Sequence, residues 1–201
     1  MEDIAILVLA AGKSTRMNST KQLEKIGNSF LLEIVLNKIK TLFNKEDIYC
    51  VLGANFNKIK NKISNNNISI IFNEDYNNGL SSSIKSGLNY VKNEDKNYKG
   101  IFIILGDQPA IDNGYFKEMI SLFYQYKNKI VASKYKEKVG VPAIFPSIYF
   151  DDIEKIEGDK GAKEYLNNKK NNVIFPESIP NLVDIDTQED LKLFKKRMNE
   201  I

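Results

Sequence analysis

The chain opens with an uninterrupted run of apolar residues at Ile4–Leu9, half of them β-branched. A run of this length and type is typical of a strand buried on both faces, as in a parallel sheet. Comparable runs follow at Ile48–Leu52, 68–72, Gly100–Leu105 and 130–133. Between them, apolar residues recur every three or four positions, which is the spacing of amphipathic helices. The alternation predicts an α/β fold with a mostly parallel sheet and helices on both faces.

Three helix starts are predicted from polar residues that directly precede such a helical pattern. Ser29, Asp112 and Thr187 can each accept a hydrogen bond from a first-turn N–H group, which is the usual role of an N-cap. A polar turn is predicted at 73–79. No internal repeat, low-complexity linker or shift in composition divides the chain, so residues 1–201 are predicted to form one domain.

Composition and charge exclude several classes of function. The net charge is only +3 and the charged residues are scattered, which argues against a nucleic-acid interface. The sequence contains no histidine, so histidine bases, triads and metal sites are excluded. The single cysteine, Cys50, lies in an apolar run and is expected to be a buried thiol. With no long apolar span and no signal-peptide pattern, we expect a cytoplasmic protein without membrane contacts.

A loop of small residues follows the first predicted strand and carries two cations nearby, Arg16 and Lys21. Small residues let a backbone approach a ligand closely, and free N–H groups there can hold phosphate oxygens. The two cations add charge-assisted contacts to such oxygens. The loop lacks both the Walker pattern and the glycine spacing of the dinucleotide fingerprint. An ordinary loop with solvated cations is the alternative interpretation.

The order Leu-Ala-Ala-Gly-x-Ser-x-Arg-Met, followed by Lys-Gln-Leu, resembles the signature loop of the MobA-like NTP transferase family, whose members serve the molybdenum cofactor. The Ala-Ala-Gly form is similar to the cytidylyltransferase branch, whereas the guanylyltransferase branch usually has Ala-Gly-Gly. The resemblance implies a Rossmann-like α/β/α fold of the nucleotide-diphospho-sugar transferase type. It also implies catalytic roles for Arg16 and Lys21, and a nucleotide site formed by Leu9, Ala10, Ala11 and Gly12.

A second block, from Gly79 to Gly87, contains three consecutive serines at a predicted strand-to-helix corner. Helix capping explains them without any ligand, but three hydroxyl groups also suit the polar edge of a nucleobase. The block resembles the Gly-Leu-x-x-Ser-Leu-Arg-x-Gly segment of the same family, which faces the base. Lys85 replaces the family's arginine and lacks its planar fork. The nucleotide-binding residues that the resemblance implies here are Gly79, Leu80, Ser81, Ser82 and Ser83.

Two aspartates are the candidate metal ligands. Asp107 follows the strand at Gly100–Leu105, and the carboxyl ends of parallel strands line the ligand crevice of open α/β sheets. An Asp-Pro turn is the alternative, but Gly-Asp-Gln-Pro resembles the metal motif of the family. The stretch around Asp186 resembles the family's Asp-Ile-Asp-Thr-x-Glu-Asp-Leu element, whose second aspartate joins the same metal; Asp184 is the weaker choice. Carboxylate oxygens suit Mg²⁺, which is the expected cofactor.

Two further blocks resemble the acceptor side of the family. The first is similar to Gly-x-Pro-x-x-Phe, with Val141 where a histidine is common, and the second to Gly-Asp-x-Gly-Ala-Arg, with lysine in place of arginine. A simpler interpretation makes Asp159 the cap of a short helix through Leu166. The acceptor-binding residues implied are Gly140, Pro142, Asp159, Lys160, Gly161 and Lys163.

Together these resemblances imply a Mg²⁺-dependent enzyme that transfers CMP from CTP to the phosphate of molybdopterin and releases pyrophosphate. A molybdenum hydroxylase is the implied partner that receives the product. Two alternatives stay open: use of GTP or of a sugar or polyol phosphate acceptor, and a non-catalytic factor that delivers molybdenum cofactor. The aspartate pair and the two cations favour catalysis, because a carrier does not need a pair of metal-ligating carboxylates.

Overall fold

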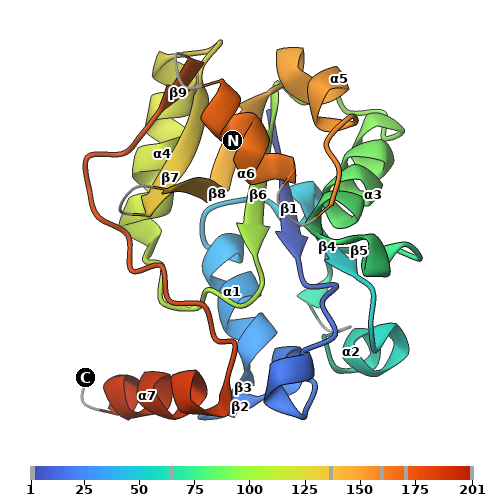
Figure 1. The fold of residues 1–201 in the computed structure, drawn as a ribbon, viewed down its shortest axis with the longest axis vertical. Coiled ribbons are helices and arrows are strands. Elements are labelled where there is room, and N and C mark those ends of the chain that lie inside the picture. The colour runs from blue at the N-terminus through green and yellow to red at the C-terminus, as the bar shows by residue number, and fades with distance from the viewer. Residues whose placement is uncertain (1–2, 64–65, 136–137, 159–160, 170–171, 200–201) are drawn as a thin grey trace.

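The computed structural model describes residues 3–63, 66–135, 138–158, 161–169 and 172–199, which share one seven-stranded sheet in the order β5-β4-β1-β6-β8-β7-β9 (Figure 1). The strands of this sheet are β1 (Ile4–Leu9), β4 (Ile48–Leu52), β5 (Ser69–Phe72), β6 (Gly100–Leu105), β7 (Ile130–Tyr135), β8 (Lys138–Pro146) and β9 (Val173–Ile174). A small antiparallel pair consists of β2 (Lys25–Ile26) and β3 (Ser29–Phe30). The helices are α1 (Leu31–Lys40), α2 (Phe56–Ile63), α3 (Leu80–Lys92), α4 (Asn113–Gln125), α5 (Phe150–Ile153), α6 (Gly161–Asn168) and α7 (Gln188–Asn199).

The sheet is covered on both faces, because its central strands are apolar on both sides. In β1, Ile4, Ile6 and Val8 pack against one group of helices, α1, α2 and α4. The alternate residues Leu7 and Leu9 pack against α3, α5 and α6 on the opposite face. The predicted three-layer α/β/α fold with a mostly parallel sheet is therefore confirmed.

One strand runs against the others. β8 pairs antiparallel with both β6 and β7, and it contains Gly140 and Pro142, two of the acceptor-binding residues that the family resemblance implies. Pro142 cannot donate to a ladder, and the register between β7 and β8 shifts between Ala132 and Ser133 beside it. Ser133 donates its hydroxyl proton to the Pro142 carbonyl at 2.8 Å. The interrupted ladder explains why this strand is inconspicuous in the sequence.

The helix caps agree with prediction in two of three places. Asp112 accepts the N–H of Tyr115 at 2.9 Å, and Thr187 accepts the N–H of Asp190 at 3.1 Å. The prediction for Ser29 is wrong. Ser29 pairs with Ile26 in the β2–β3 ladder, so α1 begins after Phe30. The Glu33 carboxylate accepts the Phe30 N–H at 2.9 Å and closes the first turn instead.

A third, smaller apolar cluster lies at the edge of the sheet where β1 and β6 end. It joins α7, through Leu191 and Phe194, to Met17, Leu31 and Ile185. Figure 1 shows α7 below the carboxyl ends of the strands, beside β2 and β3. The chain between β9 and α7 therefore brings the predicted second aspartate to this edge. Among the described helices, none has the length and apolar character that a membrane crossing requires.

Candidate active site

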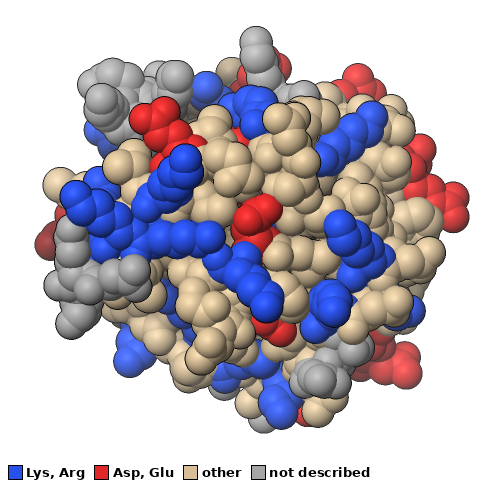
Figure 2. All heavy atoms as spheres, turned by 90° about the horizontal axis from the view of Figure 1, so that it is seen from below, with Lys and Arg blue, Asp and Glu red and all other residues tan. Residues whose placement is uncertain are grey.

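A cleft of about 360 Å³ opens at the carboxyl ends of β1 and β6, which pair at Leu9 and Leu105. It joins the small-residue loop, the corner before α3 and the exit of β6 at one place. Seen from this edge, Lys and Arg side chains surround a central group of Asp and Glu side chains (Figure 2). The residues lining the cleft are Leu9, Ala10, Ala11, Gly12, Arg16, Lys21, Gln22, Tyr76, Gly79, Leu80, Ser83, Leu105, Gly106 and Asp107.

The loop after β1 holds an open row of backbone donors. Ala10 donates its N–H to Val51 O, and Ala11 O accepts from Ala54, so the chain stays bonded to the sheet this far. Beyond this point, the N–H groups of residues 12–14 donate to no other described residue. Ser14 has a left-handed backbone with φ of 57°, which turns the loop. Successive free N–H groups in such a turn form an anion-binding concavity.

Gln22 holds this loop in shape, a role that sequence reasoning missed. Its side chain is buried, and Nε2 donates to Ala10 O at 2.9 Å and to Gly12 O at 3.1 Å. Its Oε1 accepts the hydroxyl proton of Ser14 at 3.2 Å. The loop carbonyls are thereby turned toward Gln22, which leaves the neighbouring N–H groups free for a ligand.

Replacing Gln22 with leucine is expected to lower the free energy of unfolding by about 1–3 kcal/mol, because two carbonyls lose their donor. Urea denaturation followed by circular dichroism measures the change. Gln125→Leu is the matched control, since Gln125 is exposed and its side chain contacts the Tyr126 hydroxyl at 3.3 Å. Equal denaturation midpoints for Gln22→Leu and wild type would contradict this role.

The exit of β6 places Asp107 close to the loop. Gly106 donates its N–H to Leu9 O at 2.9 Å, and a Cβ there would lie 3.0 Å from the Ala10 Cβ and 2.9 Å from Leu32. Glycine permits this close approach without displacing either side chain. Lys38 then fixes the turn that follows, because its Nζ donates to Ile111 O at 2.9 Å and also to Pro109 O.

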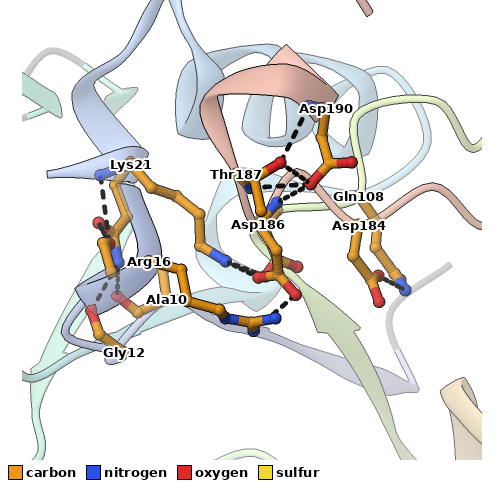
Figure 3. A network of polar contacts seen from close by, with 12 residues as sticks. Ala10, Gly12, Arg16, Lys21, Gln108, Asp184, Asp186, Thr187 and Asp190 are labelled. Atoms are coloured by element: carbon orange, nitrogen blue, oxygen red, sulfur yellow. Dashed lines mark hydrogen bonds and ion pairs between the residues drawn. The ribbon is translucent and has the colours of Figure 1, made fainter. Parts of the chain in front are cut away.

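Asp186 reaches the same point from the far end of the chain. Ile185 donates its N–H to Asp107 O at 3.0 Å and is fully buried, so its neighbour Asp186 faces the cleft side. The Asp190 carboxylate accepts the N–H of Thr187 at 2.8 Å and that of Asp186 at 3.2 Å. These bonds fix the turn that presents Asp186 (Figure 3).

Lys21 lies between Asp107 and Asp186. Figure 3 shows its ammonium group directed at Asp186. Its Nζ is 2.7 Å from Asp107 Oδ2 and 2.8 Å from Asp186 Oδ1, and its side chain is 12% exposed. Arg16 Nη2 is 2.8 Å from the other oxygen of Asp186, Oδ2, and the Arg16 side chain is 68% exposed. The structure therefore brings all four predicted catalytic and metal-ligating side chains together.

The charges of this cluster reinforce one another. Burial lowers the pKa of Lys21, but the charge of Asp107 and hydrogen bonds to both aspartates outweigh it, so the pKa is raised. For Asp186, burial raises the pKa, and Lys21 and Arg16 lower it by more, so the pKa lies below its usual range. Lys21 is thus charged and Asp186 ionised at neutral pH.

The donor set fits a hard divalent cation. Asp107 Oδ1 is buried and has no hydrogen-bond partner among the described residues. Asp107 and Asp186 also point oxygens at one ammonium group, so the two carboxylates converge. One or two carboxylates are what Mg²⁺ takes from a protein when phosphates and water complete its shell. Three or more metal-binding side chains are not gathered anywhere in the described part of the chain.

Asp184, the weaker candidate, turns away from Lys21 (Figure 3). Its Oδ1 accepts from Gln108 Nε2 at 2.7 Å. Burial raises the pKa of Asp184, and the charges of Asp107 and Asp186 raise it further against the hydrogen bond from Gln108. Asp184 is therefore held by Gln108, whereas the Lys21 ammonium forms its ion pairs with Asp107 and Asp186.

The serine corner divides between two surfaces. Ser83 lines the cleft with Gly79 and Leu80, whereas Ser81 and Ser82 line a separate polar hollow that also contains Lys85. Of the three predicted serines, one therefore faces the small-residue loop. Tyr76, which sequence reasoning missed, also lines the cleft, and the Lys13 ammonium of the small-residue loop lies 5.9 Å from its ring centroid.

Of the predicted acceptor residues that the structure describes, Gly140, Pro142 and Lys163 do not line the cleft. Gly140 and Pro142 belong to β8, and Lys163 is an exposed residue of α6, which begins at Gly161. The Ser81 N–H donates to Gly158 O at 3.3 Å, which links the serine corner to the chain just before α6. Asp159 and Lys160 lie outside the described residues. The acceptor assignments remain predictions.

Comparison with known proteins places this site in a family. A model of the MobA-like NTP transferase domain matches residues 6–173, most of the chain, and ends before Asp186. The structure of the Mycobacterium sp. strain JC1 homolog of Mycobacterium tuberculosis Rv0371c is 26% identical. The alignment covers 99% of this chain and 98% of that one, with a TM-score of 0.83. A manganese complex of Rv0371c from Mycobacterium tuberculosis is 22% identical over 96% and 98% of the two chains, with a TM-score of 0.77.

A curated relative matches locally. The bifunctional protein GlmU of Vesicomyosocius okutanii subsp. Calyptogena okutanii (strain HA) is 55% identical over 47 residues. That stretch is 22% of this chain and spans about a tenth of the relative. Because the family model matches most of this chain, the chain belongs to the MobA-like NTP transferase family, and it is a nucleotidyltransferase.

Proposed function

We propose that this nucleotidyltransferase transfers CMP from CTP to the phosphate of molybdopterin and releases pyrophosphate. The observation that carries the proposal is the Lys21 ammonium between Asp107 and Asp186, beside a loop with free N–H groups. This arrangement offers cations and backbone donors to a triphosphate and two carboxylates to its metal. Ala11, where the guanylyltransferase branch has glycine, favours cytidine as the nucleoside.

The reaction is an in-line displacement at the α-phosphorus of CTP. A phosphate monoester is already anionic at neutral pH, so the acceptor needs no general base, which suits a chain without histidine. Catalysis then consists of positioning and of stabilising charge as the bond to pyrophosphate breaks. Arg16 and Lys21 supply positive charge for the leaving group.

Asp107 and Asp186 would hold Mg²⁺, which supplies charge neutralisation to the phosphates when bound. The Lys21 ammonium takes the same carboxylate oxygens in this structure. Lys21 therefore exchanges the carboxylates for phosphate oxygens when nucleotide and Mg²⁺ are present. The unbranched lysine stem allows this movement, whereas a planar guanidinium fork is less free to change partners.

The identity of the acceptor is tested by product analysis. The protein is incubated with CTP, Mg²⁺ and, in separate reactions, molybdenum cofactor, a sugar 1-phosphate and a polyol phosphate. Mass spectrometry is expected to find a CMP adduct of molybdopterin alone. An adduct of a sugar or polyol phosphate instead would assign the acceptor to the alternative class. Binding of molybdenum cofactor without any adduct would support a delivery factor. A molybdenum hydroxylase partner and a cytoplasmic location remain predictions.

A further inference from the structure

Asn73, directly after β5, has its side-chain amide held in one orientation. The residue is 3% exposed, and its Oδ1 accepts the Asp75 N–H at 3.0 Å. Its Nδ2 lies 2.9 Å from Ser82 Oγ and 3.0 Å from Ser83 Oγ. Turning the amide over would set Nδ2 against the Asp75 N–H, donor against donor. The hydrogen-bond network therefore assigns the NH₂ group to the two serines.

This orientation decides the polarity of both hydroxyl groups. An amide NH₂ can only donate, so both serine oxygens accept from Asn73. The Ser82 hydroxyl donates its own hydrogen bond to Gly79 O at 2.8 Å. Ser83 is 4% exposed and lines the cleft, and no acceptor for its proton lies among the described residues. The Ser83 proton is thus left for a ligand in the cleft.

We propose that Asn73 is a positioning residue, which orients the Ser83 hydroxyl as a hydrogen-bond donor to the nucleobase. This inference rests on the proposed binding of a nucleotide in this cleft. The partner of Ser83 must then be an acceptor atom. Cytosine presents two adjacent acceptors, N3 and O2, on its pairing edge. Guanine presents one, O6, beside two donors. A fixed hydroxyl donor therefore suits cytosine over guanine.

Asn73→Asp reverses the polarity with little change in shape. The new carboxylate accepts where the amide donated, so it takes the Ser83 proton and leaves only lone pairs facing the base. The expected loss of CTP affinity is about 10-fold to 100-fold, as for a buried polar group without a partner. Asn73→Ala removes the donor but leaves the Ser83 proton free to rotate. Its expected loss is smaller than that of Asn73→Asp.

The test is calorimetric binding to the full chain in Mg²⁺, with CTP and inorganic tripolyphosphate as separate ligands. Tripolyphosphate shares the phosphates of CTP but has no base. Asn73→Asp and Ser83→Ala are each expected to weaken CTP binding and to leave tripolyphosphate binding within about 2-fold of wild type. The double variant is expected to be no worse than Ser83→Ala, because contacting residues are not additive. Asn113→Asp is the control: it has the same charge change and contacts the Thr41 hydroxyl outside the cleft.

The outcomes separate this inference from the proposed function. Equal weakening of CTP and tripolyphosphate, or additive losses in the double variant, would overturn the role of Asn73. If Asn73→Asp does not fold, the same cycle with Asn73→Ala applies, and additive losses overturn the role there too. If the wild-type protein binds CTP no more tightly than tripolyphosphate, the inference is refuted, but the proposed phosphate site is still supported. A wild-type protein that binds neither ligand refutes the proposed function and the inference with it.

Discussion

Asp107→Ala is expected to lower turnover by about 10³-fold or more, because it removes one of the two carboxylates proposed to hold the metal and the preorganised charge beside the phosphates. The fold should persist, since the side chain lies at the edge of the cleft and is 22% exposed. Removing it also leaves Lys21 paired with Asp186. Initial rates across a magnesium titration measure the loss, and circular dichroism checks the fold.

Asp151→Ala is the matched control for this variant. Asp151 is an exposed residue of α5 that pairs with Lys92 at 3.8 Å, away from the cleft. It should retain the wild-type rate at every magnesium concentration. Near-normal activity of Asp107→Ala at limiting magnesium would contradict the metal assignment.

Lys21→Met should lower turnover by about 10²–10³-fold while CTP affinity falls only modestly, because the ammonium is proposed to stabilise charge that develops on pyrophosphate. The same variant should bind Mn²⁺ more tightly than wild type when no nucleotide is present. In wild type, the ammonium occupies the oxygens of Asp107 and Asp186, and methionine cannot. Electron paramagnetic resonance of free Mn²⁺ measures this affinity without any turnover.

Lys25→Met, at an exposed position of β2, controls for the loss of one surface charge. Equal losses of CTP binding and turnover in Lys21→Met would indicate uniform binding instead of transition-state stabilisation. Unchanged Mn²⁺ affinity would contradict the competition between Lys21 and the metal. A variant with normal binding and normal turnover would make the loop an ordinary solvated connection.

The sequence pattern predicts the parallel half of the sheet well, because β1, β4 and β6 are buried on both faces and read as unbroken apolar runs. It misses β8, where Gly140 and Pro142 interrupt the strand pattern and the antiparallel ladder shifts register. It also misplaces the start of α1, since the pairing of Ser29 with Ile26 depends on a hairpin that periodicity does not reveal.

The candidate site divides in the same way. Asp107 could be found from its place at a strand end, and Asp186 from its resemblance to a family element, and the fold brings both to Lys21. Gln22 and Asn73 could not be found, because their roles depend on bonds to backbone and hydroxyl groups whose positions only the fold defines. The structural signal that both share is a polar side chain in a residue that is only 3% exposed.

The most direct test of the proposed cytidylyl transfer is pyrophosphate release from each of the four NTPs, measured in Mg²⁺ with and without molybdenum cofactor. Release is expected to require the cofactor and to be fastest with CTP. Faster release from GTP than from CTP, or release from CTP that does not depend on the cofactor, would contradict the proposal.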